Sequence, residues 1–213
     1  MKITIFWHRR DLRFQDNAGL AAALQSGHPV LPLFIYDQTI LEKLPRDDAR
    51  LTFIFDQVAQ LAHEAHEAGG GFVARHGKVP EVFKQLLNDY DVAAIYTNED
   101  YEPYATERDT AVAKLAEKHG AEFKAFKDQV IFAKDEVLTK NGKPSKVFGA
   151  YSKAWQAKVT PDDFKPHPST RLFKKENLAA LKATDQKRPT LKDLGFERYE
   201  QPTPPARLPD ADV

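Results

Sequence analysis

Charged side chains crowd the end of the first apolar run of the sequence. Residues 2–8 read KITIFWH, a β-branched and aromatic run typical of a buried parallel strand. Residues 9–17, RRDLRFQDN, follow at once with three arginines and two aspartates. Guanidinium groups held beside a buried strand end usually have partners, which favours a binding loop over a merely solvated one. Open α/β sheets bind their ligands at this edge, so the loop is the first candidate site.

A second polar loop is expected to face the first. Residues 92–97, VAAIYT, resemble a fourth strand and lead into residues 98–104, NEDYEPY. In a doubly wound sheet the first and fourth strands are usually neighbours, at the point where strand order reverses. The crevice between the loops would suit a flat aromatic ligand with a polar edge. The residues that we expect to bind it are Trp7, His8, Arg9, Asp11, Arg13, Asp37, Asn98, Asp100, Glu102 and Tyr104.

The motifs of common nucleotide and hydrolase chemistry do not occur in the sequence. Neither G-x-G-x-x-G nor a lysine-terminated P-loop follows the first strand, and no serine or threonine lies in a nucleophile-elbow context. His63 and His66 are three residues apart on a predicted helix, but no third ligand lies near them, so we expect no metal site. We therefore expect this chain to hold no catalytic set of its own.

The apolar pattern predicts an α/β fold with a doubly wound, five-stranded parallel sheet of Rossmann-like type. Short apolar runs alternate with helical patterns of period 3.6 and are joined by short loops. Asn17 or Asp16 can cap the first helix, and Asp48 can cap a long one that Gly69–Gly71 ends. The predicted strands are residues 2–8, 29–36, 72–75, 92–97 and 121–126.

Three regions follow from this pattern. Residues 1–130 form the α/β domain, and residues 131–190 form an extension with one helix, near residues 147–159, that packs on the domain. Residues 191–213 read as a linker that leads to something further, since the last of them, PTPPARLPDADV, are rich in proline.

Composition narrows the class of protein. The chain has 213 residues, no cysteine and a formal net charge of zero. Acidic residues outnumber basic ones in residues 1–113, and the reverse holds in residues 114–192, which permits contact with an acidic partner or with nucleic acid; lysines scattered over exposed helices would give the same balance. No apolar stretch is long enough to span a bilayer and no signal peptide is evident, so we expect no membrane partner and a cytoplasmic location.

Four motifs, in order along the chain, resemble those of the DNA photolyase and cryptochrome family. The first is Trp7–Arg13, WHRRDLR, with Asp16-Asn17, and the second is Asp100–Tyr104 with Arg108-Asp109. The third runs from Val147-Phe148 through Tyr151–Trp155, and the fourth is Leu191–Phe196. Together they cover essentially the whole chain.

The resemblance implies the antenna half of a two-domain protein. In this family an amino-terminal α/β domain can carry a light-harvesting chromophore, and a helical domain, absent from this chain, binds FAD and repairs pyrimidine dimers in DNA. The chain's partners would then be a chromophore, its own helical domain and, through the whole protein, DNA. Family members that bind a folate antenna carry an Asn-Glu pair where this chain has Tyr104-Ala105. A deazaflavin or flavin is therefore expected in preference to methenyltetrahydrofolate.

Two other functions stay open on the sequence. One is a cryptochrome-type photoreceptor domain, which residues outside this chain would distinguish from a photolyase. The other is a stand-alone nucleotide-binding α/β protein, a class that typically shows the glycine-rich phosphate loop that this sequence lacks.

Overall fold

Five parallel strands form the centre of the molecule, as the sequence predicts. The structure is a computed structural model that describes residues 1–139, 141–182, 185 and 187–200. The strand order is β3-β2-β1-β4-β5, and every pairing is parallel. Strand order therefore reverses between β1 and β4, the neighbours expected from the pattern. The strands are β1 (Ile3–His8), β2 (Val30–Asp37), β3 (Val73–Gly77), β4 (Val92–Asn98) and β5 (Glu122–Phe126).

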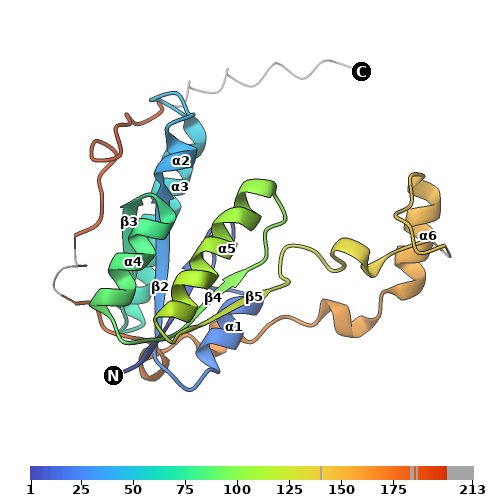
Figure 1. Ribbon diagram of the computed structural model, residues 1–213, viewed down its shortest axis with the longest axis horizontal. Coiled ribbons are helices and arrows are strands. Elements are labelled where there is room, and N and C mark those ends of the chain that lie inside the picture. Colours follow the sequence, from blue (N-terminus) through green and yellow to red (C-terminus); the bar gives the residue numbers. More distant parts are fainter. Residues whose placement is uncertain (140, 183–184, 186, 201–213) are drawn as a thin grey trace, which may run out of the picture.

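Helices cover both faces of the sheet (Figure 1). The predicted caps are present, since the side chains of Asn17 and Asp48 accept hydrogen bonds from the amides of Leu20 and Arg50. The helices are α1 (Ala18–Leu24), α2 (Gln38–Leu41), α3 (Ala49–Glu67), α4 (Val79–Asp89), α5 (Pro103–Lys118), α6 (Phe148–Lys158) and α7 (Ser169–Leu172). Three single 3-10 turns lie at Lys134–Glu136, Pro161–Phe164 and Lys175–Asn177.

Alternate side chains of β1 build two separate cores. Phe6 packs with α1 and α3 on one face of the sheet, and Ile5 and Trp7 pack with α4 and α5 on the other. Such alternation is what a strand buried on both faces produces. The carboxyl end of β1 is thereby held rigidly between the two layers, and it carries the first candidate loop with it.

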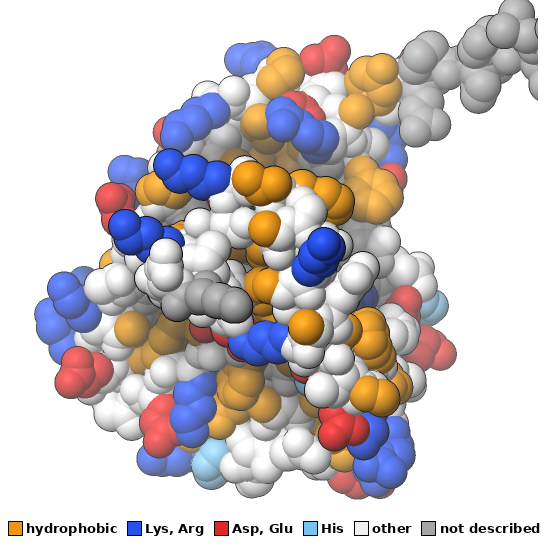
Figure 2. All heavy atoms as spheres, turned by 90° about the vertical axis from the view of Figure 1, so that its right-hand side faces the viewer, with side chains coloured by type: hydrophobic (Ala, Val, Ile, Leu, Met, Phe, Trp, Pro, Cys, Tyr) orange, Lys and Arg blue, Asp and Glu red, His pale blue; other side chains and the backbone are white. Residues whose placement is uncertain are grey.

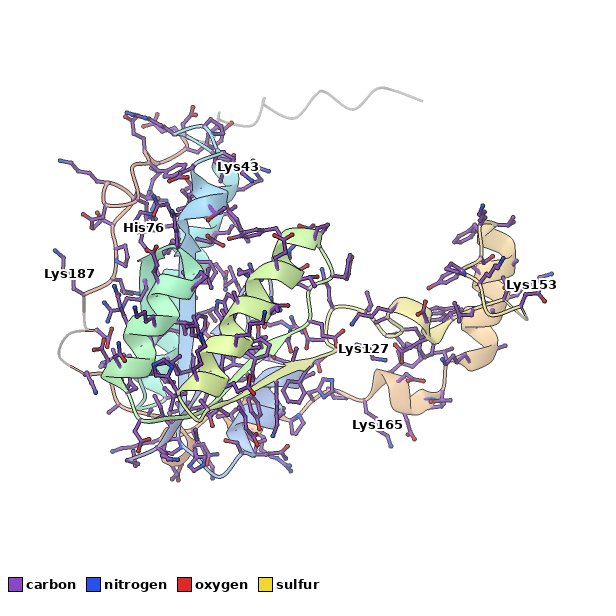
Figure 3. The ribbon with its side chains drawn as sticks, in the orientation of Figure 1. Lys43, His76, Lys127, Lys153, Lys165 and Lys187 are labelled. Atoms are coloured by element: carbon purple, nitrogen blue, oxygen red, sulfur yellow. The ribbon has the colours of Figure 1, made fainter. Side chains whose placement is uncertain are left out.

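The helix that we expected to pack on the domain, α6, has no buried residue, whereas Ser169, Leu178 and Ala179 of the same extension are buried. After Asp128 the chain leaves the body as an arm, and α6 lies at the far end of this arm with none of its residues buried (Figure 1). Lys127 marks the base of the arm and Lys153 its outer part (Figure 3). Apolar and lysine side chains lie side by side on its exposed end (Figure 2). Within the arm, Trp155 of α6 packs edge-on against Phe132, with the ring centroids 5.7 Å apart, while Phe148 of the same helix is exposed.

The stretch that we interpreted as a linker is packed for part of its length. Leu194 and Phe196 are 6% and 9% exposed and belong to the core beside α3. Arg198 then forms two 2.8 Å hydrogen bonds to the carboxylate of Asp56, and the amide of Tyr199 donates to Thr52 Oγ1. Residues 191–199 are thus part of the domain, and the proline-rich remainder of the predicted linker, 202–213, lies outside the described residues.

Candidate functional site

The two candidate loops meet at the carboxyl edge of the sheet. Trp7 and Thr97 are paired in the β1–β4 register, so the residues after them leave the sheet side by side. Their side chains and those of neighbouring elements enclose two cavities, which share Arg9, Arg10 and Asp100 as a common wall. The first cavity, of about 180 Å³, reaches back to β2 and α3. The second, of about 230 Å³, lies beside the loop that follows β5.

Asn98 joins the two loops to the start of α1. Its Nδ2 donates to Oδ2 of Asp11 at 2.7 Å and to Oδ1 of Asn17 at 3.0 Å. Its Oδ1 accepts from the amide of Gly19 at 2.9 Å. A Cβ at position 19 would lie 2.5 Å from that oxygen, so only glycine allows the approach. Asn98 and Asp11 therefore belong to the framework of the site and not to its open surface.

Asp128 completes this framework from the loop after β5. Its side chain is 3% exposed, and its Oδ1 accepts from the amide of Ala18 at 2.8 Å. Its Oδ2 accepts from the guanidinium of Arg13 at 2.7 Å. The second cavity is thus walled by charges that already pair with one another.

Trp7 carries two guanidinium groups on its indole ring. Arg108 lies 4.7 Å and Arg9 5.1 Å from the ring centroid, within the range of cation–π attraction. Asp109 holds both, accepting from Arg9 Nη1 at 2.5 Å and from Arg108 Nη2 at 3.1 Å. Phe83 packs edge-on against Trp7, with the ring centroids 5.0 Å apart. Trp7 is therefore a buried anchor for the cations, while Arg9 Nη2 is buried without a hydrogen-bond partner among the described residues.

His8 is fully buried at the end of β1. Its ring lies against Phe6, Phe14 and Phe72, and its Nδ1 is 3.0 Å from the carbonyl oxygen of Asp11. Burial lowers the pKa of His8 below its ordinary value, and the charge of Asp11 opposes this shift only in part. His8 is consequently neutral near pH 7 and acts as an aromatic wall of the first cavity.

The first cavity combines apolar walls with polar groups at its rim. The hydroxyl of Tyr104 donates to Oδ2 of Asp37 at 2.6 Å, and burial together with this bond raises the pKa of Tyr104. Arg10 is more than half exposed and reaches Asp100 at 3.3 Å and Glu102 at 2.7 Å. The apolar and aromatic walls are Phe34, Ile35, Tyr36, Ile40, Leu41, Leu51 and Ile54. A flat ring could lie among these walls and present its edge to Asp37 and Arg10.

All ten residues named from the sequence line one of the two cavities. Four of these ten residues are held by contacts within the protein. Trp7, His8 and Asn98 are buried, and Asp11 accepts a hydrogen bond from Asn98. Arg10 and Arg108 were absent from our set, although both lie within the motifs that we had singled out. The apolar wall of α3 was also missed, because Leu51 and Ile54 fit the spacing of an ordinary core-facing helix.

Other sequence features do not join the site. His76 is an exposed residue of the edge strand β3 (Figure 3) and lines neither cavity. Within the described ranges, no group of three or more His, Asp or Glu side chains could hold a metal ion. In the same part of the chain, no helix is long and apolar enough to cross a bilayer.

Three comparisons with known proteins point to the same family. The model of the family described as DNA photolyase matches residues 4–184. A deoxyribodipyrimidine photo-lyase from Synechococcus is 32% identical over 194 residues, which is 91% of this chain and 40% of that protein. The archaeal photolyase of Sulfolobus tokodaii, whose crystal structure contains two FAD molecules, superimposes with a TM-score of 0.70 at 27% identity, over 96% of this chain and 43% of that one.

A class III photolyase from Agrobacterium tumefaciens shares the fold, with a TM-score of 0.73 at 24% identity over 96% of this chain and 39% of that one. The chain spans about two fifths of the length of these photolyases. Because the family model covers most of the sequence and the sheet matches throughout, this chain belongs to the DNA photolyase family, as an amino-terminal α/β domain of the photolyase and cryptochrome kind.

Proposed function

We propose that this chain is an antenna domain that binds a light-harvesting chromophore of the deazaflavin or flavin type in the first cavity. The proposal rests on the composition of this cavity. Its walls are apolar, and two polar pairs, Asp37 with Tyr104 and Arg10 with Asp100, lie at its rim. Flavin-type rings have an apolar face and an edge of alternating donors and acceptors, which this arrangement matches. Arg9 Nη2, buried without a partner among the described residues, adds a donor that a ring oxygen could satisfy.

The whole protein would use the absorbed light for repair. We propose that it repairs cyclobutane pyrimidine dimers in DNA, and that FAD for this reaction is held by a helical domain outside this chain. The Synechococcus relative is a deoxyribodipyrimidine photo-lyase, which supports repair over a purely signalling role. By this proposal, the chain with added FAD leaves illuminated dimer-containing DNA unrepaired, because the groups that carry electron transfer lie elsewhere.

Titration of the chain with chromophores tests the antenna proposal. Riboflavin, a deazaflavin and a reduced folate are added to the wild type, to Asp100→Ala and to Glu102→Ala, and fluorescence quenching is followed. Flavin-type ligands should bind more tightly than the folate, and each substitution should weaken them by about tenfold, since each disturbs the charge that orients Arg10. Glu117→Ala, at the far end of α5, is the matched control. A preference for the folate, or flavin binding that neither substitution changes, would refute the assignment.

A further inference from the structure

We infer that the charges of Arg9 and Arg108 prevent Trp7 from passing an electron to an excited chromophore in the first cavity. The two arginines would then preserve the absorbed energy, because electron transfer from a neighbouring side chain would dissipate it. The inference rests on the proposed function, since it takes a light-absorbing ring to lie in that cavity. It assigns a role to a buried cluster whose members bind one another and not a ligand.

An indole in the wall of an antenna site can quench the chromophore. Trp7 lines the first cavity, and indole is an easily oxidised side chain. An excited flavin-type ring readily takes one electron from such a neighbour, which becomes a radical cation. The electron then returns to the indole and the excitation energy is released as heat. The cycle leaves no net oxidation, but the energy is lost for any later use.

The two guanidinium groups oppose the first step of this cycle. Their central carbons lie 4.7 Å (Arg108) and 5.1 Å (Arg9) from the centroid of the Trp7 ring. They attract the neutral indole, but they would repel the positive charge of its radical cation. Water screens this repulsion little, because both arginine side chains are only 7% exposed. Removing an electron from Trp7 is therefore more difficult here than from an indole without these neighbours.

One carboxylate holds both cations without cancelling their charge. Asp109 accepts from Arg9 at 2.5 Å and from Arg108 at 3.1 Å, and both guanidinium groups are thereby fixed over the same ring. Among the described residues, no other side-chain carboxylate pairs with either arginine. One positive charge is thus in excess within the cluster. It persists at any working pH, since a guanidinium does not lose its proton in proteins.

Arg108 also covers a second oxidisable ring of the cavity wall. Its guanidinium lies 5.6 Å from the ring centroid of Tyr104. The hydroxyl of Tyr104 donates to Asp37, a ready proton acceptor, so this phenol can also lose an electron to an excited ring. Because one guanidinium lies over both electron donors, Arg108 is the residue whose charge should matter most.

The fluorescence lifetime of bound riboflavin tests the inference. Equilibrium dialysis of the purified chain first shows how much riboflavin is bound, and time-resolved emission then gives the lifetime of the bound fraction. Arg108→Met keeps a long apolar side chain and removes the charge, so it should shorten this lifetime by about threefold or more. Arg108→Lys restores a cation at the same place and should retain most of the wild-type lifetime.

Removal of the indole identifies the electron donor. Trp7→Phe keeps an aromatic ring in the core, and in the Arg108→Met background it should recover most of the lost lifetime. The matched control in the same background is Trp155→Phe, which removes the other tryptophan of the chain, on α6, and should recover none. If Arg108→Met does not fold, Arg9→Met makes the same test on the second guanidinium.

The outcomes separate the inference from the antenna proposal. A lifetime that loss of the guanidinium leaves unchanged, or a shortening that Trp7→Phe does not reverse, would overturn the inference and leave the antenna proposal intact. Failure of riboflavin to bind the wild type would overturn the antenna proposal, and the inference with it.

Discussion

The hydroxyl of Tyr104 donates a 2.6 Å hydrogen bond to Oδ2 of Asp37 and so joins the first turn of α5 to the end of β2. Asp37 Oδ1 already accepts from the amide of Thr39, which fixes the carboxylate in place. Tyr104 thus occupies the acceptor that a ring N–H of a chromophore would use. Under the proposed function, the hydroxyl of Tyr104 therefore competes with the chromophore for Asp37.

Tyr104→Phe should therefore strengthen flavin binding several-fold, because it releases the carboxylate without removing the aromatic wall. Asp37→Ala should weaken binding by about tenfold or more, the usual cost of losing a hydrogen bond to a charged group. Fluorescence titration of both variants with riboflavin measures these changes. Weaker binding by Tyr104→Phe would show that the hydroxyl contacts the ligand directly.

Asn98→Ala should destabilise the domain by about 2–4 kcal/mol. The substitution removes two donors and one acceptor from a buried network. It leaves the amide of Gly19 without its acceptor and takes one of the donors from Asp11 Oδ2. Denaturant unfolding followed by circular dichroism gives the free energy of unfolding. Asn88→Ala, on the exposed side of α4, is the control and should change stability by no more than about 0.5 kcal/mol. Equal effects of the two variants would contradict the structural role of Asn98.

The sequence predicted the sheet well because its strands are short apolar runs separated by clear breaks. The adjacency of β1 and β4, and with it the place of the crevice, followed from the strand order of doubly wound folds. The direction in which side chains point could not be predicted in the same way. Asp11 and Asp100 lie in similar charged loops, yet Asp11 hydrogen-bonds to buried Asn98 and Asp100 forms an ion pair with exposed Arg10.

The arm and the end of the chain show a second limit of sequence patterns. Residues 147–159 do contain a helix, but periodicity says nothing of whether its apolar face meets the body. Leu194 and Phe196 lie in a short stretch that shows no sustained apolar period, and yet both reach the core. Burial at such places is decided by tertiary contacts with α3, which the local pattern does not record.

Acidification should destabilise the domain through His8. Burial keeps the pKa of His8 below its ordinary value of 6.5, so the unfolded chain binds a proton more readily than the folded one does. The contribution of neutral His8 to the free energy of unfolding is therefore complete above about pH 6.5. It decreases as the pH falls below that value, with a slope of at most about 1.4 kcal/mol per pH unit. Asp11 and Asp128, which favour the protonated ring, and Arg13, which opposes it, are the charges around His8.

Unfolding midpoints measured between pH 7.5 and 5.5 test this for the wild type and for His8→Gln. The unfolding midpoint of the wild type should decrease as the pH falls from 7.5 to 5.5. The variant should have a lower midpoint at pH 7.5, and its midpoint should change less with pH. His28→Gln, in the loop before β2, is the matched control and should keep the wild-type slope. An identical slope in His8→Gln would show that other groups cause the dependence.

Phe196→Ala should cost about 2–4 kcal/mol of folding free energy, although the residue lies in a stretch that its sequence marks as a linker. Its ring is buried with Leu194 in the core beside α3, and truncation would remove that apolar contact and leave a cavity. Phe164→Ala is the matched control, because Phe164 lies on the arm and is 59% exposed. Its loss should change stability by less than about 0.5 kcal/mol. Denaturant unfolding of both variants distinguishes a packed segment from a linker, since a linker would give the same small effect at both positions.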